Sequence, residues 1–256
     1  MTDHDRPLWT WLTTERIPGG GESYRQRLWS AHGGPNAGDA GKAAVRYTTK
    51  TDDYERVLSQ MPYLVTDGRG GQVMRGGNAP PGHGSFLVRE PGGRFHAQTF
   101  PAHTSFPTES AAINRRGDAV FAGSVGDHEV YALYRGHDGH VVGPVNLTPD
   151  DKPYYNGRAQ AGIDAAGRAV VTWVSSVGDL YLLDHPDTVR AAMSDRRGHF
   201  KQTALVSGDA YDNMDPNLGV SPSGRAIVAW HRVRWKPDSD DSVWSRPYVA
   251  RGHTPR

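Results

Sequence analysis

Side chains suited to acid-base chemistry and hydrogen bonding recur shortly before four glycines of this 256-residue chain. The glycines are Gly70, Gly117, Gly167 and Gly224, and the side chains that precede them by seven to nine residues are Tyr63, Glu109, Ser110, Arg158, Gln160, Asp215 and Asn217. Carboxylate, guanidinium, amide and phenol groups gathered around one funnel suit a hydroxylated or charged small ligand. We therefore expect Tyr63, Gln160 and Asn217 to contact such a ligand.

Glu109 and Asp215 are the residues that we expect to do chemistry, because a carboxyl group with a raised pKa can donate a proton while a second one stays ionised. Arg158 would hold an anionic group of the substrate, and His231 is a further catalytic candidate as a base near neutral pH. The sequence thus predicts an enzyme of hydrolase, lyase or cyclase type, if it is an enzyme at all. The alternatives are a non-catalytic carbohydrate or metabolite binder and a protein-interaction scaffold, in which these carboxylates cap turns or pair across repeats.

Four further side chains are predicted to bind the ligand from long, polar connections. Tyr155 and Asp212 lie in segments that combine aromatic rings with amides and carboxylates, which suits a sugar or a planar ring. His103 lies in another such connection, and Trp235 breaks the repeat position of the other tryptophans. Each has a structural alternative, since tyrosines often pack between sheets with a bonded hydroxyl group.

The elements that must position these residues are read from a repeat. Residues 162–174 form two apolar runs around the turn Asp164-Ala-Ala-Gly167, where the glycine supplies the positive φ of a short hairpin. Near-copies end at Gly70, Gly117 and Gly224, at spacings of 47, 50 and 57 residues, and a second strand-turn-strand signal follows each copy. Four strands per period are typical of propeller blades. Trp173 and Trp230 share one repeat position and are predicted to pack in the core.

A family resemblance agrees with this interpretation. Residues 221–230 resemble the blade repeat of bacterial Tol-type β-propellers. They read Ser-Pro-Ser-Gly-Arg-Ala-Ile-Val-Ala-Trp, the repeat reads Ser-Pro-Asp-Gly-(Lys/Arg)-x-Ile-x-(Phe/Trp), and Ser223 stands in place of the usual Asp. The resemblance implies an all-β fold and no particular activity. We expect one domain over residues 1–256, a five-bladed β-propeller of four-stranded antiparallel blades with incomplete first and last blades. The blades are predicted at 7–47, 60–100, 110–148, 160–207 and 217–256.

Composition excludes some partners and leaves others open. The chain has no cysteine, so disulfides and thiolate metal sites are excluded. A net charge of +1 argues against nucleic acid as a partner, and no segment is long and apolar enough to suggest a membrane span. Without a signal-like start, the default location is cytoplasmic. We predict no metal and no cofactor, although the acidic segments leave calcium open. The incomplete end blades leave a homodimer open.

Overall fold

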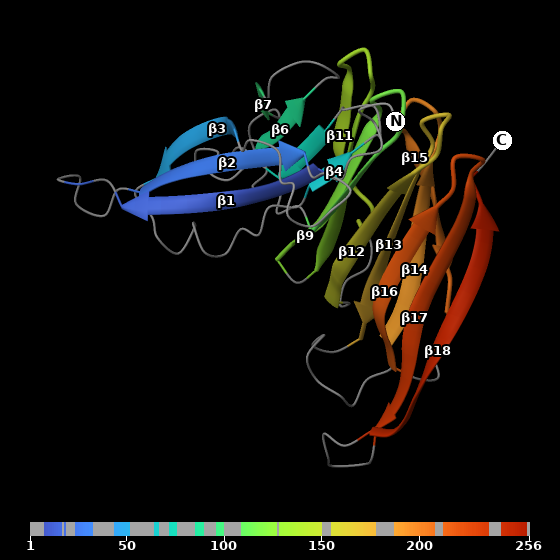
Figure 1. Cartoon of the computed structure of the whole chain (residues 1–256). Coiled ribbons are helices and arrows are strands. Elements are labelled where there is room, and N and C mark those ends of the chain that lie inside the picture. The colour runs from blue at the N-terminus through green and yellow to red at the C-terminus, as the bar shows by residue number, and fades with distance from the viewer. Residues whose placement is uncertain are drawn as a thin grey trace. The chain divides into compact units, whose positions relative to one another are not determined.

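The computed structural model describes residues 8–16, 18, 24–32, 44–51, 64–66, 72–75, 85–89, 96–99, 109–126, 128–149, 155–177, 187–207, 212–235 and 242–254. The chain divides into two compact units, Met1–Thr104 and Ser105–Arg256, called unit 1 and unit 2 here. All regular elements of the described ranges are β-strands (Figure 1). Within these ranges no helix has the length and apolar character needed to cross a membrane.

Unit 1 contains two antiparallel sheets. The first has the order β1-β2-β3, with β1 (Leu8–Arg16), β2 (Tyr24–His32) and β3 (Ala44–Thr51). The second has the order β4-β5-β6-β7, with β4 (Leu64–Thr66), β5 (Gln72–Arg75), β6 (Ser85–Arg89) and β7 (His96–Thr99).

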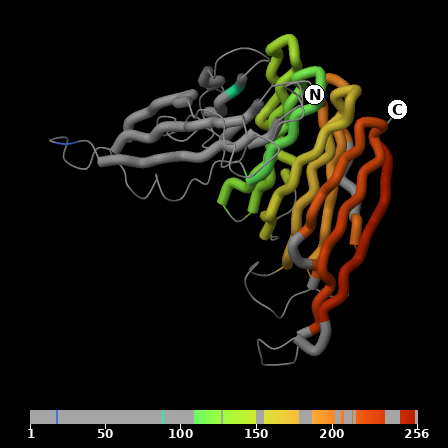
Figure 2. The backbone as a smooth tube through the Cα atoms, in the orientation of Figure 1, coloured from blue at the N-terminus to red at the C-terminus, as the bar shows by residue number. Residues whose placement is uncertain are grey.

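Unit 2 contains three antiparallel meanders, whose strands lie side by side in Figure 2. The first has β8 (Ser110–Ile113), β9 (Ala119–Val125), β10 (Glu129–Arg135) and β11 (Val141–Asn146). The second has β12 (Tyr155–Ile163), β13 (Ala169–Ser176), β14 (Asp187–Ser194) and β15 (Phe200–Leu205). The third has β16 (Asp212–Val220), β17 (Arg225–Trp235) and β18 (Ser242–His253).

The turns that join the first two strands of each meander in unit 2 have the predicted geometry. Gly117, Gly167 and Gly224 have φ values of 90°, 86° and 85°, a region that favours glycine. The turns also contact one another: the Asn114 side chain donates to the Asp164 carbonyl oxygen at 2.9 Å, and the Ala165 N–H donates to the Pro222 carbonyl oxygen at 3.1 Å. The three turns therefore lie together at one end of unit 2, which we call the turn end.

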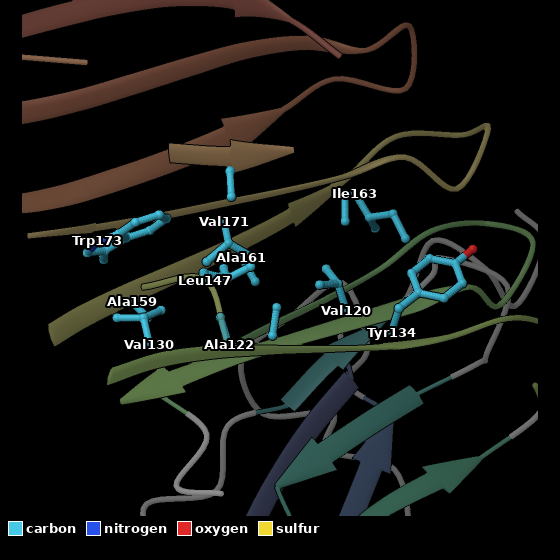
Figure 3. Packing of buried hydrophobic residues seen from close by; sticks show 13 residues of the cluster. Val120, Ala122, Val130, Tyr134, Leu147, Ala159, Ala161, Ile163, Val171 and Trp173 are labelled. Atoms are coloured by element: carbon cyan, nitrogen blue, oxygen red, sulfur yellow. The ribbon is translucent and has the colours of Figure 1, made fainter. Parts of the chain in front are cut away.

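The core of unit 2 packs the second meander against the first. In Figure 3, Trp173, Val171 and Ala161 lie opposite Val130 and Ala122, and all five side chains belong to one buried cluster. Several of the other members are also alanines, so a chain with only 36% hydrophobic residues can bring its sheets close together. A smaller cluster of Val189, Val228 and Trp230 joins the second and third meanders.

The structure confirms the all-β class with four-stranded antiparallel sheets, and it confirms the buried positions of Trp173 and Trp230, which are 0% and 5% exposed. The first and last sheets each have three described strands. β12 and β16 begin at Tyr155 and Asp212, five residues before the approximate blade starts at 160 and 217. A β-bulge in each strand interrupts the alternation by which a strand is recognised. β17 likewise continues to Trp235, so this tryptophan ends a strand instead of lying in a loop.

Candidate functional site

The two bulges are equivalent positions of the repeat. Between Gly157 and Gln160, two residues of β12 lie opposite Trp173 alone, and between Met214 and Asn217, two residues of β16 lie opposite Trp230 alone. The extra residues are Arg158-Ala159 in β12 and Asp215-Pro216 in β16. We call this part of unit 2, together with Glu109, the bulge edge. It brings the backbones of the predicted residues Arg158 and Asp215 to corresponding places in neighbouring sheets.

Arg158 has the only positive φ, 56°, of any described residue other than glycine. A side chain in this left-handed region costs of order 1 kcal/mol or more, and it persists only where its surroundings hold it. Arg158 is half-buried and interacts with neighbouring residues. Backbone strain of this kind occurs preferentially at ligand sites and next to active sites.

Glu109 holds the Arg158 bulge from the neighbouring sheet. One carboxylate oxygen accepts the Ala159 N–H at 2.5 Å, and the other accepts both the N–H and the hydroxyl of Ser124 in β9. All three hydrogen bonds are donated to the carboxylate, so Glu109 accepts and does not donate in this arrangement. The contact is the pairing across repeats that sequence analysis gave as the alternative to catalysis, and a catalytic role for Glu109 stays a prediction.

A second contact between sheets lies beside the bulge of β12. The buried Asn156 side chain donates to the His128 carbonyl oxygen at 2.8 Å. The His128 ring lies against the Tyr155 ring, with centroids 4.6 Å apart and a tilt of 40°. Tyr155 is half-buried and His128 is exposed, so the ring pair presents an aromatic surface at the edge of the sheet.

The third meander repeats the asparagine contact. The buried Asn213 side chain donates to the Asp187 carbonyl oxygen at 2.5 Å and accepts the Trp230 indole N–H at 2.7 Å. Neither asparagine was among the predicted site residues. The available signal was their spacing, since Asn156 and Asn213 each stand eleven residues before a turn glycine, Gly167 and Gly224.

The structure places the other predicted residues less closely together. Gln160 is half-buried opposite Thr172, and Asn217 is exposed opposite Ala229. His231 is exposed in β17, where its register partner in β16 is Met214, the residue before Asp215, and its Nδ1 lies 3.3 Å from the Ser245 hydroxyl. For Asp212, Asp215 and Trp235 the structure gives the backbone in β16 or β17. Tyr63 and His103 lie outside the described residues.

Shifted pKa values are found at the turn end. Burial alone would raise the pKa of Asp118, but hydrogen bonds from Asn114 and His137 and the charge of Arg116 outweigh it and lower that pKa. Burial of Asp164 is likewise outweighed by hydrogen bonds from the Arg168 backbone and from Thr254, which lower its pKa. These carboxylates hold the turns together. Among the described side chains, no group of three or more His, Asp or Glu could hold a metal ion.

No protein-family model matches the chain, and no curated protein sequence does. Solved structures do resemble it. An ulvan lyase of polysaccharide lyase family PL25, bound to a GlcA(1-4)Rha3S saccharide, has a TM-score of 0.51 and 12% identity over 92% of this chain and 67% of that chain. At this identity the likeness shows the fold alone, which is of the β-propeller type.

Two arabinan-degrading enzymes are weaker matches. The α-L-arabinanase of Penicillium chrysogenum, complexed with arabinobiose, has a TM-score of 0.43 and 9% identity over 72% of this chain, which spans only 59% of that enzyme. The endo-arabinase of Bacteroides thetaiotaomicron has a TM-score of 0.39 and 13% identity over 98% of this chain and 95% of that one.

Proposed function

We propose that this protein is a carbohydrate-active enzyme that binds a hydroxylated saccharide at the bulge edge of unit 2 and acts on it by acid-base chemistry. The observation that carries the proposal is the strained Arg158, held in the left-handed region by a carboxylate from the neighbouring sheet. Glycine would fit this φ without strain, so the contacts of the Arg158 side chain must offset the cost of the backbone conformation. We infer that a ligand is among these contacts.

The surroundings of Arg158 favour a sugar as the ligand. The His128 and Tyr155 rings offer an aromatic surface, and the half-buried Gln160 offers an amide two residues beyond Arg158 in β12. Arg158 would bind an acidic group or a pair of hydroxyl groups of the saccharide. Saccharides are also the ligands of the ulvan lyase and of the Penicillium arabinanase.

Catalysis is assigned to Asp215, with His231 as its partner. Asp215 occupies the bulge position equivalent to Arg158, and His231 pairs in register with its neighbour Met214. A carboxyl group and an imidazole can divide the roles of acid and base in hydrolysis or in elimination. Glu109 fixes the bulge, and a catalytic role for it stays a prediction. The reaction within the hydrolase, lyase and cyclase types, the five-bladed single domain, the homodimer and the cytoplasmic location stay predictions.

The test combines a binding screen with an activity screen. The full chain is incubated with a panel of neutral and acidic polysaccharides, and binding, reducing ends and the ultraviolet absorbance of unsaturated products are measured. We expect Arg158→Gly to lose binding, and Asp215→Asn to keep binding and lose turnover. Arg197→Ala, which removes an exposed cation from a turn of the same meander, is the control and should change neither. A ligand that Arg158→Gly binds as tightly as the wild type would refute the assignment.

A further inference from the structure

A hollow of about 510 Å³ opens at the turn end of unit 2, away from the bulge edge. Its walls come from the second and third meanders and are formed by Arg168, Ser223, Arg225, His253 and Thr254. Two of these side chains are arginines, one is a histidine and two carry hydroxyl groups, and none is acidic. The volume lies within the range of about 300–1,000 Å³ that is usual for small-molecule sites.

The repeat explains why Arg225 has no carboxylate partner among the residues that the structure describes. In the second meander, the turn begins with Asp164, and the Arg168 Nε donates to its carboxylate at 2.6 Å. Arg225 occupies the same position in the third meander, but its turn begins with Ser221. The Ser221 hydroxyl accepts the Arg225 backbone N–H at 3.0 Å and carries no negative charge. The guanidinium of Arg225 thus lacks the carboxylate that its repeat counterpart has.

The partner of Arg225 across the sheet adds a second nitrogen donor. His253 of β18 lies directly opposite Arg225 in register, and both side chains are exposed. Neither forms an ion pair with any described residue. The guanidinium of Arg225 and the imidazole of His253 can therefore both donate hydrogen bonds to an anion between or beside them.

The floor of the hollow is fixed. The Thr254 hydroxyl donates to the buried Asp164 carboxylate at 2.9 Å, and the Thr254 N–H donates to the Gly224 carbonyl oxygen at 2.8 Å. The Asp164 carboxylate also accepts the Arg168 Nε and two backbone N–H groups, so its negative charge is matched by four donors. Ser223, whose hydroxyl lies 3.1 Å from that of Ser221, adds an exposed hydroxyl group at the rim.

We propose that this hollow is a binding site for a phosphate or sulfate ester of a sugar-sized molecule. Arg225 and His253 bind the ester oxygens, and Ser223 donates a hydrogen bond at the rim. Arg168 lines the wall from the neighbouring sheet, with its own charge balanced by Asp164. Charge-assisted hydrogen bonds from guanidinium to an oxyanion are among the strongest in proteins. Arg225 begins β17, six residues or about 20 Å before His231, so the hollow is a second site and does not depend on the catalytic residues proposed above.

Isothermal titration calorimetry on the full chain tests the proposal, with inorganic phosphate, inorganic sulfate, glucose 6-phosphate and glucose as probes at one ionic strength set by potassium chloride. We expect glucose 6-phosphate to bind more tightly than phosphate, and glucose not to bind. Arg225→Ala should weaken binding by about 10-fold to 100-fold, the effect of one charged hydrogen bond. His253→Gln should weaken it less. The preference between phosphate and sulfate identifies the ester.

Arg234→Ala is the matched control, since Arg234 is an exposed arginine about 30 Å further along β17. It should bind every probe as the wild type does. Equal losses in Arg225→Ala and Arg234→Ala would mean general ionic attraction and would overturn the proposal, as would unchanged binding in Arg225→Ala. Inorganic phosphate that binds as tightly as glucose 6-phosphate would contradict a sugar ester as the ligand. Thermal melts in chloride alone establish that each variant is folded.

Discussion

Trp173 and Trp230 occupy the same repeat position but differ in one hydrogen bond, which makes them a natural pair for a stability experiment. Both indoles are buried, at 0% and 5% exposure. The Trp230 Nε1 donates to the Asn213 Oδ1 at 2.7 Å, whereas the Trp173 Nε1 has no hydrogen-bond partner in the described part of the chain. Replacing each by phenylalanine removes a similar volume, so the cavity costs should be similar and the hydrogen bond should decide the difference.

Trp230→Phe would remove the hydrogen bond that the indole donates to Asn213, a side chain with 0% exposure. Removing one partner of a buried hydrogen bond costs about 1–3 kcal/mol. Trp173→Phe instead removes a buried donor that is unpaired already. We therefore expect Trp230→Phe to lower the free energy of unfolding by about 1–3 kcal/mol more than Trp173→Phe does.

Urea unfolding followed by circular dichroism measures this difference, provided that the m-values of the two variants agree. The double variant Trp230→Phe with Asn213→Ala closes a cycle, and it should cost less than the sum of the two single changes because they share one bond. Equal losses in the two phenylalanine variants, or a larger loss in Trp173→Phe, would refute the assignment of the hydrogen bond as the difference between the repeats.

Three further predictions concern the turns and the bulge. The pKa of Asp164 is lowered in the folded chain, so its contribution to stability is complete above the ordinary pKa of 3.8 and is lost as the pH falls through the lower, folded pKa. In acid titrations, Asp164→Asn should therefore lose less stability than the wild type below about pH 4. Gly224→Ala should cost more than about 1–2 kcal/mol in urea melts, because φ is 85° and the new Cβ would lie 2.3 Å from the Thr254 Oγ1, while Gly219→Ala, with open space around it, should cost less. Arg158→Gly should be more stable than Arg158→Ala by about 1 kcal/mol, since only glycine accepts the positive φ freely; the opposite order in thermal melts would contradict backbone strain at this position.

The turns were predictable from the sequence because their geometry is local. A glycine at the fourth position of Asp164-Ala-Ala-Gly167 supplies the positive φ, and the side chain of the first residue binds the backbone of the third and fifth. The same rule holds at Asp195, whose carboxylate accepts the backbone N–H groups of Arg197 and His199. Such short-range chemistry depends on four or five consecutive residues, so a repeat search finds it.

The bulge edge was only partly predictable, since its contacts join residues far apart in the chain. Spacing from the turn glycines identified Arg158 and Asp215, but Pro216 and the broken alternation made the first halves of their strands look like loops. The partner of Glu109 is a backbone N–H 50 residues away in the next sheet. No sequence pattern specifies which backbone group a bulge turns toward a neighbour, and this long-range bond changes how Glu109 is interpreted.

The hollow at the turn end is positively charged because Ser221 stands where the second meander has Asp164. Restoring an aspartate at position 221 should therefore abolish anion binding. Ser221→Asp would place a carboxylate where Asp164 pairs with Arg168, at four residues before Arg225. The new ion pair would be exposed, so we expect a gain of about 0.2–1 kcal/mol in the free energy of unfolding at low salt. Arg225 would then be neutralised by its own turn, and calorimetry should show that glucose 6-phosphate binding is lost although every wall residue is still present. Ser221→Asn, which keeps the turn hydrogen bonds without the charge, should bind as the wild type does. If Ser221→Asp kept its affinity, the missing carboxylate would not be the reason for the site, because the positive charge of Arg225 would then not be what holds the anion.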